Sequence, residues 1–289
     1  MSDDGLPDPD DDVPLDLAEF YDQHTEREWN RLDRDFHHRL EWEGTVEYLD
    51  RHLPASGHVL DAGGGAGRYA VWLAERGLDV TMLDLSAGQV AFAREKAREH
   101  GVADRVTFVR GDVRALPVPA DRFDATCCLG GPLSHVLDAT EREGAVGELA
   151  RATVPGAPVF VSVMGLMASV TRMMRYAGRV DDEADDTELL ADLARTGDYD
   201  EDLLERYGRD PTVQQMHLFR ADEFEALLAA GGLQVETLAA LEGPFSQRRD
   251  HLDELTDEHR AVVRETLDVL REDRHVVDHS AHMLAVCRA

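Results

Sequence analysis

Three aspartates follow consecutive short apolar runs, at positions where each could contact a bound small molecule. They are Asp61, Asp84 and Asp112. In that order, their carboxylates are suited to accept hydrogen bonds from an ammonium group, from ribose hydroxyls and from an adenine amine. Aspartate also caps helices and forms turns, so each residue taken alone is ambiguous. Their succession at the ends of consecutive runs favours ligand contact, and three acids suit a cationic nucleoside without phosphate better than a dinucleotide.

A glycine-rich turn at residues 63–67 comes directly after Asp61 and directly before an amphipathic segment. Glycine permits positive φ and lets a ligand approach the main chain closely. The free N–H groups at the start of the following helix then face that ligand. This arrangement predicts a cradle for a nucleotide-type cofactor.

The glycine pattern alone does not distinguish a dinucleotide from S-adenosylmethionine. The third small residue of the dinucleotide pattern falls on Arg68 when the count starts at Gly63, and on Ala70 when it starts at Gly65. Asp61 would repel a pyrophosphate but suits the ammonium group of a methionine, which favours S-adenosylmethionine. Arg68, in the first helical turn, is either solvated or in contact with the carboxylate of the cofactor.

His135 is the residue best suited to acid–base chemistry. It lies in a glycine- and proline-containing loop (residues 130–135) after the fourth apolar run. A histidine there could take a proton from a hydroxyl or amine acceptor. The alternative is a loop histidine that caps or packs. We expect no metal site, and structural roles for His37, His38, His217, His279 and His282.

Short apolar strands and amphipathic helices alternate along residues 59–164, which predicts a parallel sheet with helices on both faces. The predicted strands are residues 59–62, 80–83, 106–109, 123–129 and 158–164, and the predicted helices are 67–76, 86–100 and 138–152. Beyond residue 220, the pattern predicts helices at 221–230 and 254–272, with strands at 233–241 and 282–287.

The chain divides into five expected parts. Residues 1–14 form an acidic tail that we expect to be disordered, and residues 15–53 form an N-terminal helical lid with a break near residues 33–38. Residues 54–165 form the cofactor-binding core. Residues 166–220 are acidic, helical and without strand signal, and are expected to form an insertion that caps the substrate. Residues 221–289 complete the sheet.

The net charge of −29 arises from 59 acidic and 30 basic residues, with Lys96 as the single lysine. Such a composition predicts adaptation to a cytosol with molar salt, where the Debye length is about 3 Å and self-repulsion is screened. We therefore expect a halophile and a cytoplasmic protein. The acidic chain disfavours nucleic acid as a partner.

No apolar run approaches the length of a membrane span, and the acidic N-terminus is unlike a signal peptide. We therefore expect no membrane partner. Cys127, Cys128 and Cys287 show neither disulfide nor zinc spacing and are expected to be buried free thiols.

The motifs resemble those of the class I S-adenosylmethionine-dependent methyltransferases. Residues 59–67 resemble the glycine motif of that family, Asp84 resembles the acid of its second motif, and residues 111–113 resemble its adenine-side motif. Residues 123–135 resemble the fourth strand with its active-site loop, and residues 155–156 resemble a Pro-Gly turn before the fifth strand. The resemblance implies a Rossmann-like, doubly wound α/β fold whose seven-stranded sheet has its last strand antiparallel.

The resemblance also implies a set of site residues. Contacts to S-adenosyl-L-methionine are expected from Asp61, Gly63, Gly65, Arg68, Asp84, Leu85, Asp112, Val113 and Leu129. In this family the N-terminal segment often folds over the cofactor, which implies that Tyr21 bounds the transferred methyl group. Packing in the core or at an interface is the alternative for Tyr21.

We therefore expect an S-adenosylmethionine-dependent methyltransferase that acts on a small-molecule acceptor with an O, N or C nucleophile, by in-line displacement. His135 would serve as the base where the acceptor carries a proton. The alternatives are a tRNA wobble-uridine carboxymethyl methyltransferase, which residues 61–65 resemble, a non-catalytic S-adenosylmethionine-binding protein, and an NAD(P)-linked oxidoreductase. A monomer and a homodimer are both compatible with the sequence.

Overall fold

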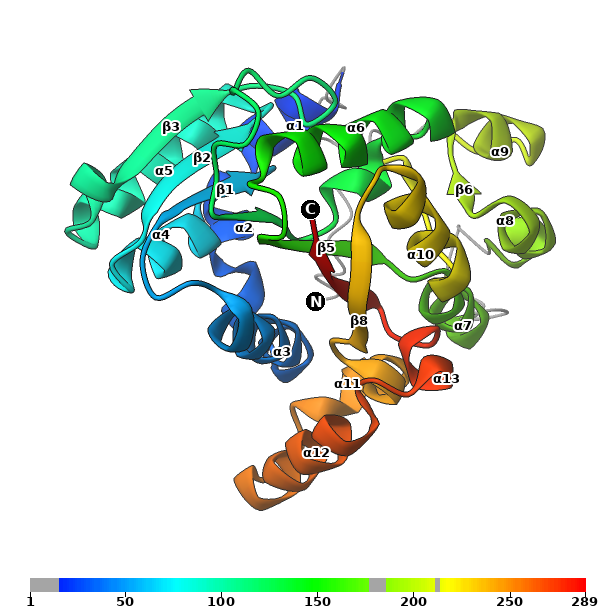
Figure 1. The fold of residues 1–289 in the computed structure, drawn as a ribbon. Coiled ribbons are helices and arrows are strands. Elements are labelled where there is room, and N and C mark those ends of the chain that lie inside the picture. The colour runs from blue at the N-terminus through cyan, green and yellow to red at the C-terminus, as the bar shows by residue number, and fades with distance from the viewer. Residues whose placement is uncertain (1–15, 177–185, 211–213) are drawn as a thin grey trace.

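The computed structural model describes residues 16–176, 186–210 and 214–289, so the predicted tail at 1–14 lies outside the described residues. Its centre is a seven-stranded sheet with the strand order β3-β2-β1-β4-β5-β9-β8 (Figure 1). The strands are β1 (His58–Ala62), β2 (Asp79–Asp84), β3 (Val106–Arg110), β4 (Ala125–Cys128), β5 (Pro158–Met164), β8 (Gln234–Ala240) and β9 (His282–Arg288).

Strands β1 to β5 pair in parallel, whereas β9 is antiparallel to both of its neighbours, β5 and β8. This confirms the expected seven-stranded sheet with an antiparallel last strand. Strand β1 lies between β2 and β4, so the chain leaves β1 toward one edge of the sheet and later returns to fill the other side. The carboxyl ends of β1 and β4 therefore form the crevice in which such sheets bind ligands.

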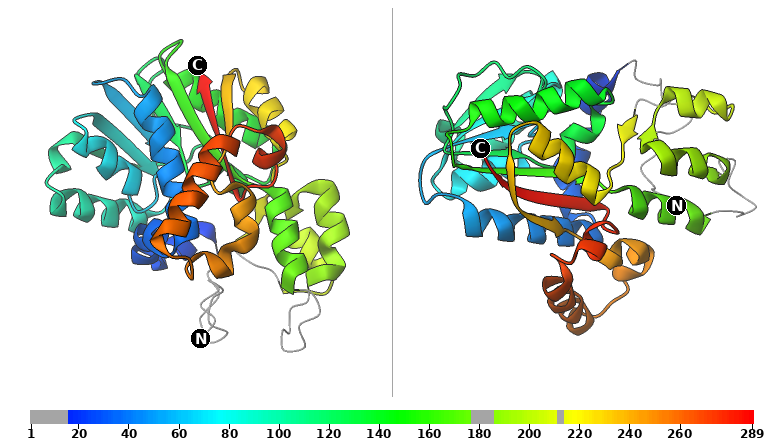
Figure 2. Two further views of the ribbon diagram at one scale, coloured as in Figure 1. Left: turned by 90° about the horizontal axis from the view of Figure 1, so that it is seen from below. Right: turned by 45° about the vertical axis from the view of Figure 1, so that its right-hand side comes forward.

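Helices cover both faces of the sheet (Figure 2). One hydrophobic cluster joins the sheet to α3 (Phe36–His52), α4 (Arg68–Glu75) and α5 (Ala87–Glu99). A second cluster joins the opposite face to α6 (Ala139–Ala152) and α10 (Ala221–Ala230). Neighbouring residues of β1 contribute to different clusters because successive side chains of a strand point to opposite faces. Cys127, Cys128 and Cys287 are buried free thiols, as expected.

The N-terminal segment forms three α-helices rather than one long helix. These are α1 (Leu17–Gln23), α2 (Thr25–Asn30) and α3, with a short 3-10 turn, η1 (Arg31–Asp33), before α3. The break expected near residues 33–38 is present, because Asp35 accepts a hydrogen bond from the His38 N–H at 2.9 Å and so caps α3. A further break at His24 separates α1 from α2.

Helix α1 is attached to the beginning of α5 by polar contacts. Asp22 Oδ1 accepts a hydrogen bond from the Gly88 N–H at 2.7 Å, and Gln89 Nε2 donates to the Tyr21 carbonyl at 2.8 Å. These contacts hold α1 at the carboxyl edge of the sheet, where the crevice opens.

The described part of the insertion contains α7 (Leu166–Tyr176), η4 (Asp186–Leu189), α8 (Leu190–Thr196) and α9 (Glu201–Arg206). The expectation of no strand in this segment was wrong. Strands β6 (Asp198–Tyr199) and β7 (Met216–His217) form a small antiparallel pair. Two residues per strand are too few to produce an alternating apolar pattern, so the sequence carried no sign of them.

The predicted helix at 254–272 is shorter than expected. Helix α12 (Asp257–Leu270) ends early, and Asp273 caps a separate short helix, α13 (Arg274–Val277). Before them come η5 (Gly243–Arg248) and α11 (Arg249–Leu252), and α12 extends away from the sheet (Figure 1).

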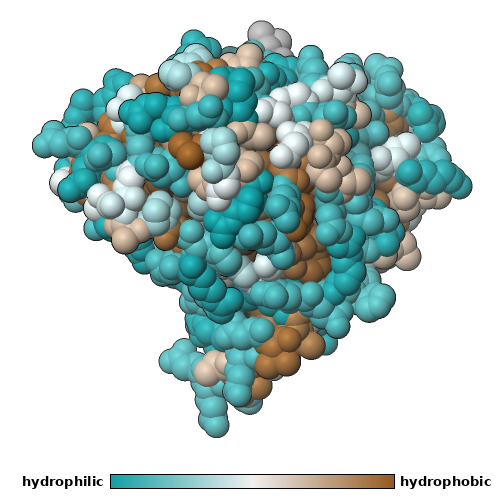
Figure 3. Space-filling view, in the orientation of Figure 1, coloured by the Kyte–Doolittle hydropathy of each residue, from teal (hydrophilic) through white to brown (hydrophobic). Residues whose placement is uncertain are grey.

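Most of the surface drawn in Figure 3 is hydrophilic, in keeping with the acidic composition. Among the helices of the described ranges, none has the length and apolar character that crossing a membrane would require.

Candidate active site

A pocket of about 460 Å³ opens at the carboxyl edge of the sheet, within the range of about 300–1,000 Å³ usual for small-molecule sites. All but one of the expected site residues line it: Tyr21, Gly63, Gly65, Arg68, Asp84, Leu85, Asp112, Val113, Leu129 and His135. The exception is Asp61.

The glycine turn after β1 forms one side of this pocket. Gly63, Gly65 and Gly67 have φ of +73°, +53° and +83°, values that favour glycine. The N–H groups of Gly63 and Gly64 donate to the carbonyl of Leu83 at 2.7 and 3.0 Å, which attaches the turn to β2. A Cβ at Gly65 would meet nothing within 4 Å. The backbone of Gly65 is therefore open to a ligand.

Asp84 supports the turn from the end of β2. Its Oδ2 accepts a hydrogen bond from the Gly65 N–H at 2.8 Å, and its Oδ1 accepts one from the Ser86 N–H at 2.9 Å. Burial raises the pKa of Asp84, although these N–H donors oppose the shift. Each carboxylate oxygen has two lone pairs. Asp84 therefore fixes the turn and still has acceptor capacity for hydroxyl groups.

Asp112, after β3, is paired with an arginine of the same loop. Arg114 donates to it through Nη2 (2.6 Å to Oδ2) and Nε (3.0 Å to Oδ1), and Arg114 Nη1 also contacts Glu141 Oε2 at 2.7 Å. The hydrogen bonds from Arg114 lower the pKa of Asp112. An amine that bound at Asp112 would share this carboxylate with Arg114.

Asp61 lies behind the pocket wall. Its side chain is 1% exposed, and a Cβ on Gly64 would lie 2.7 Å from its Oδ2. Oδ2 has no hydrogen-bond partner among the described residues. Burial, with a smaller contribution from Asp84, raises the pKa of Asp61 to about 7. The ammonium contact expected for Asp61 therefore has no direct path in this structure.

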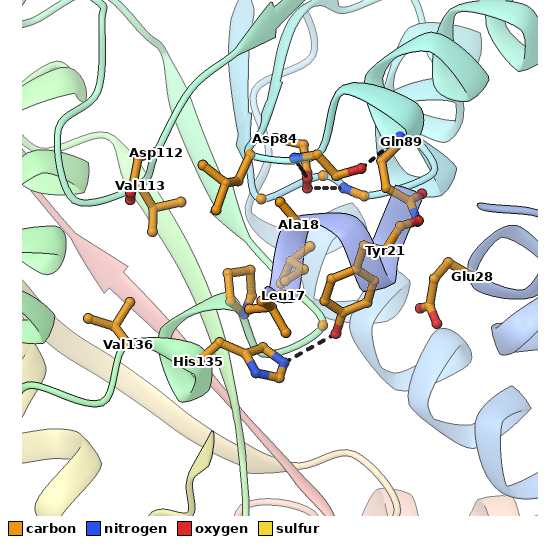
Figure 4. Close-up of a pocket in the computed structure, with 18 of the residues that line it drawn as sticks. Leu17, Ala18, Tyr21, Glu28, Asp84, Gln89, Asp112, Val113, His135 and Val136 are labelled. Atoms are coloured by element: carbon orange, nitrogen blue, oxygen red, sulfur yellow. Dashed lines mark hydrogen bonds between the residues drawn. The ribbon is translucent and has the colours of Figure 1, made fainter. Parts of the chain in front are cut away.

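Tyr21 and His135 come together although 114 positions separate them in the chain (Figure 4). The Tyr21 hydroxyl lies 3.2 Å from His135 Nε2, and His135 Nδ1 lies 3.0 Å from the carbonyl of Gln215. A carbonyl oxygen only accepts, so Nδ1 carries the proton of the neutral ring and Nε2 accepts from Tyr21. The two residues expected to take part in chemistry are thus direct neighbours.

The surroundings of this pair keep both side chains neutral. Burial lowers the pKa of His135 below its usual value of 6.5. Burial and the charge of Glu28 raise the pKa of Tyr21. At neutral pH His135 is therefore an unprotonated imidazole with a lone pair on Nε2, which is the state that a general base requires.

Arg68 contacts an acid and two aromatic rings. Its Nη2 lies 2.5 Å from Asp33 Oδ2, and its guanidinium carbon lies 5.3 and 5.0 Å from the ring centroids of Trp29 and Trp42. Arg68 also lines the pocket. The Arg68 guanidinium is thus paired with a counter-charge and packed against aromatic rings. Its contact with a cofactor carboxylate stays a prediction.

Several wall residues come from elements whose placement the sequence did not reveal. Arg31, in η1, is held by Glu41 through two contacts of 2.7 Å, and Glu28 lines the pocket beside it. Leu17 and Ala18 of α1 also line it. The helical pattern of residues 15–53 showed which side chains are apolar, but not which end of the sheet these helices would cover.

The insertion is less involved than expected. Of its described residues, none lines the pocket. One of its contacts with the site is the carbonyl of Gln215, which accepts a hydrogen bond from His135 Nδ1. A role as substrate cap stays a prediction.

Two groups of acids and histidines, none of which lines the pocket, each have three possible metal ligands within 4.8 Å: Asp35, His37 and His38, and Glu41, Glu242 and His282. In the second group, Glu242 accepts hydrogen bonds from the Ser280 hydroxyl at 3.0 Å and from His282 Nδ1 at 2.6 Å. Burial opposes protonation of His282, but Glu41 and Glu242 outweigh it and raise its pKa. Hydrogen bonds from neighbouring residues therefore stabilise the buried carboxylates. Structural roles for the histidines stay predictions.

Comparison with known proteins identifies the fold and, for one stretch of the chain, a matching family. Residues 59–156 match a family described as a methyltransferase domain. Methyltransferase GfsG of Streptomyces halstedii is 33% identical over 114 residues, which cover 39% of this chain and 40% of that protein. The chain thus matches less than half the length of this curated relative.

Solved structures with less than 25% identity share the fold. An S-adenosylmethionine-dependent methyltransferase of Methanosarcina mazei aligns with a TM-score of 0.55 and 18% identity, covering 83% of this chain and 96% of that one. The geranyl diphosphate C-methyltransferase of Streptomyces coelicolor, solved with S-adenosyl-L-homocysteine, aligns with a TM-score of 0.54 and 18% identity over 87% of this chain and 77% of that one.

The protein has the Rossmann-like fold of the class I methyltransferases, with a glycine turn and aspartates at the carboxyl edge of its sheet. Residues 59–156 of this fold match the methyltransferase-domain family.

Proposed function

We propose that this protein transfers the methyl group of S-adenosylmethionine to a small-molecule acceptor through an O, N or C nucleophile. The observation that carries this proposal is the neutral His135, whose Nε2 contacts Tyr21 in the same pocket as the glycine turn. A cofactor cradle and a general base in one pocket are what methyl transfer to a protonated acceptor requires.

The wall residues fit a nucleoside that carries positive charge and no phosphate. Gly65 leaves the backbone open, and Asp84 retains acceptor capacity for ribose hydroxyls. The arginines of the wall are each bound to an acid of the protein: Arg31 to Glu41, Arg68 to Asp33, and Arg114 to Asp112 and Glu141. A pyrophosphate would add negative charge beside these acids, whose charges already balance the arginines, which counts against an NAD(P)-linked oxidoreductase.

When bound, S-adenosylmethionine supplies a methyl group on a cationic sulfur, and transfer to a nucleophile returns the electron pair of the S–C bond to sulfur. The O–H or N–H of an acceptor takes the place of the Tyr21 hydroxyl as donor to His135 Nε2. His135 then receives that proton, while the Gln215 carbonyl holds its Nδ1–H. Tyr21 bounds the space in which the acceptor is aligned.

Alignment and exclusion of water supply the rest of the expected rate enhancement. Leu17 and Ala18 of α1 lie over the pocket beside Tyr21 (Figure 4). The attachment of α1 to Gly88 and Gln89 holds these residues at the pocket wall.

The charge of the chain and the state of His135 count against a tRNA acceptor and against a protein that only binds the cofactor. A net charge of −29 disfavours tRNA, because phosphate contacts require cationic side chains. A non-catalytic binding protein would have no need of an unprotonated histidine that contacts Tyr21 within the pocket.

Calorimetry in molar KCl with S-adenosylmethionine, S-adenosylhomocysteine and NADH tests the cofactor, and labelled methyl transfer to a panel of small amines, phenols and carboxylic acids tests the reaction. We expect the two adenosyl compounds to bind, and Asp84→Ala to lose them. A folded protein that binds neither compound, or that binds NADH in their place, would overturn the proposal.

A further inference from the structure

The pocket has two ends of different character. Asp112 and Val113 lie at one end and Glu28 lies at the other, with Leu17 and Ala18 between them (Figure 4). If an adenosine occupies the end with Asp84 and Asp112, a group attached to its 5′ position extends toward Glu28.

Glu28 belongs to α2 and lines the pocket, with its side chain 22% exposed. Among the described residues, the cationic group near the Glu28 carboxylate is that of Arg31, whose Nε lies 3.8 Å from Glu28 Oε2. This separation exceeds a hydrogen bond, so the oxygens of Glu28 remain available to a stronger donor.

The charge of Arg31 is already balanced by another residue. Glu41, with its side chain 1% exposed, accepts from Arg31 Nη1 and Nη2 at 2.7 Å each. Glu28 therefore adds an unbalanced negative charge to this end of the pocket. Arg31 uses two of its five N–H donors on Glu41 and keeps others for an anionic group.

The position of Arg31 locates this pair relative to the sheet. Its Nη2 would lie 3.7 Å from a Cβ on Gly130, the second residue after β4. The carboxyl ends of β1 and β4 form the crevice at which the chain reverses its direction across the sheet. An acid and a guanidinium at this crevice are complementary to a zwitterion such as an amino acid.

We propose that Glu28 binds the α-ammonium group of the methionyl part of the cofactor, beside Arg31, which faces its carboxylate. This inference rests on the proposed function. It assigns to an N-terminal helix the contact that the sequence suggested for Asp61, which lies behind the wall with its Oδ2 facing Gly64.

The test compares two ligands that differ only at the proposed contact region. S-adenosylhomocysteine contains the amino-acid group, whereas 5′-methylthioadenosine has the same adenosine thioether without it. Glu28→Gln is expected to weaken S-adenosylhomocysteine binding about 10- to 100-fold, as for the loss of a charged hydrogen bond, and to leave methylthioadenosine binding unchanged. Glu26→Gln is the matched control, because Glu26 is exposed on the same helix and does not line the pocket.

Calorimetry in molar KCl distinguishes the outcomes. Equal weakening of both ligands, or no weakening of either, would overturn the assignment of Glu28. A wild-type protein that binds neither ligand would overturn the proposed function instead. If Glu28→Gln binds neither ligand, Glu28→Asp decides: a reduced preference for S-adenosylhomocysteine supports the contact, and an unchanged preference overturns it.

Discussion

Replacing Asp61 by Asn is expected to remove one contribution to the pH dependence of the free energy of unfolding. Asp61 is 1% exposed, its Oδ2 has no partner among the described residues, and its pKa is raised to about 7 by burial and by Asp84. In the unfolded chain the same carboxyl group has an ordinary pKa of 3.8. Between these values the folded protein holds a proton that the unfolded chain has released.

The sign and size of the effect follow from this difference. Because the folded state binds the extra proton, the contribution of Asp61 to the free energy of unfolding falls as pH rises from about 4 and levels off above about 7. One pKa unit corresponds to about 1.4 kcal/mol, so the loss between pH 5 and pH 8 is about 3 kcal/mol. Asn cannot titrate. Its unpartnered amide lowers the free energy of unfolding by about 1–3 kcal/mol, and this cost is the same at every pH.

Urea unfolding at pH 5, 6, 7 and 8 and constant KCl measures the slope. Between pH 5 and pH 8, we expect the free energy of unfolding of the variant to rise by about 3 kcal/mol relative to that of the wild type. Asp104→Asn, at an exposed position, is the control and should follow the wild type at every pH. Parallel curves for Asp61→Asn and wild type would refute the claim that a buried, protonated carboxyl lies under the glycine turn.

Three further predictions concern the base, the turn and the charge. His135→Ala should lower methyl transfer to a protonated acceptor about 10²- to 10⁴-fold while S-adenosylhomocysteine binding is retained, and the wild-type rate should fall only below pH 6.5, because burial lowers the pKa of His135. Tyr21→Phe should bind the cofactor and lose less activity than His135→Ala. A rate that does not change in His135→Ala would show that His135 is not the base. Gly67→Ala should cost about 1–3 kcal/mol in urea unfolding, because φ is +83° and the new Cβ would lie 2.6 Å from that of Ala93; Gly144→Ala, with open space around it in α6, is the matched control and should be neutral or stabilising. The melting temperature should rise with KCl up to molar concentrations, since the net charge of −29 is then screened, and a flat response would contradict the expected adaptation to salt.

The sheet and the glycine turn could be predicted because their signals are local. Apolar strands alternate with amphipathic helices, and residues 63–67 must turn sharply after β1 whatever lies around them. The prediction that Asp84 and Asp112 line one pocket followed from their place at the carboxyl ends of parallel strands. The sequence did not show that Asp84 would already bind the Gly65 N–H, or that Arg114 would occupy Asp112.

Other features depend on packing between distant segments and could not be predicted. Whether Asp61 points into the pocket or beneath the turn depends on how residues 63–67 fold back over it. The approach of Tyr21 to His135 requires α1 to lie on α5, and contacts such as that between Asp22 and the Gly88 N–H have no sequence pattern. The amphipathic pattern of residues 15–53 likewise does not place Glu28 in the wall.

The pairing of Arg31, Arg68 and Arg114 with acids of the protein has a consequence for recognition at high ionic strength. At molar salt the Debye length is about 3 Å, so attraction over longer distances no longer guides a charged ligand into the site. Hydrogen bonds at contact distance persist under these conditions. Because each of these guanidinium groups carries its counter-charge within the folded chain, solution anions are not needed to neutralise it and need not be displaced when a ligand binds. Cofactor affinity should therefore change little across the salt range in which the fold itself is stabilised.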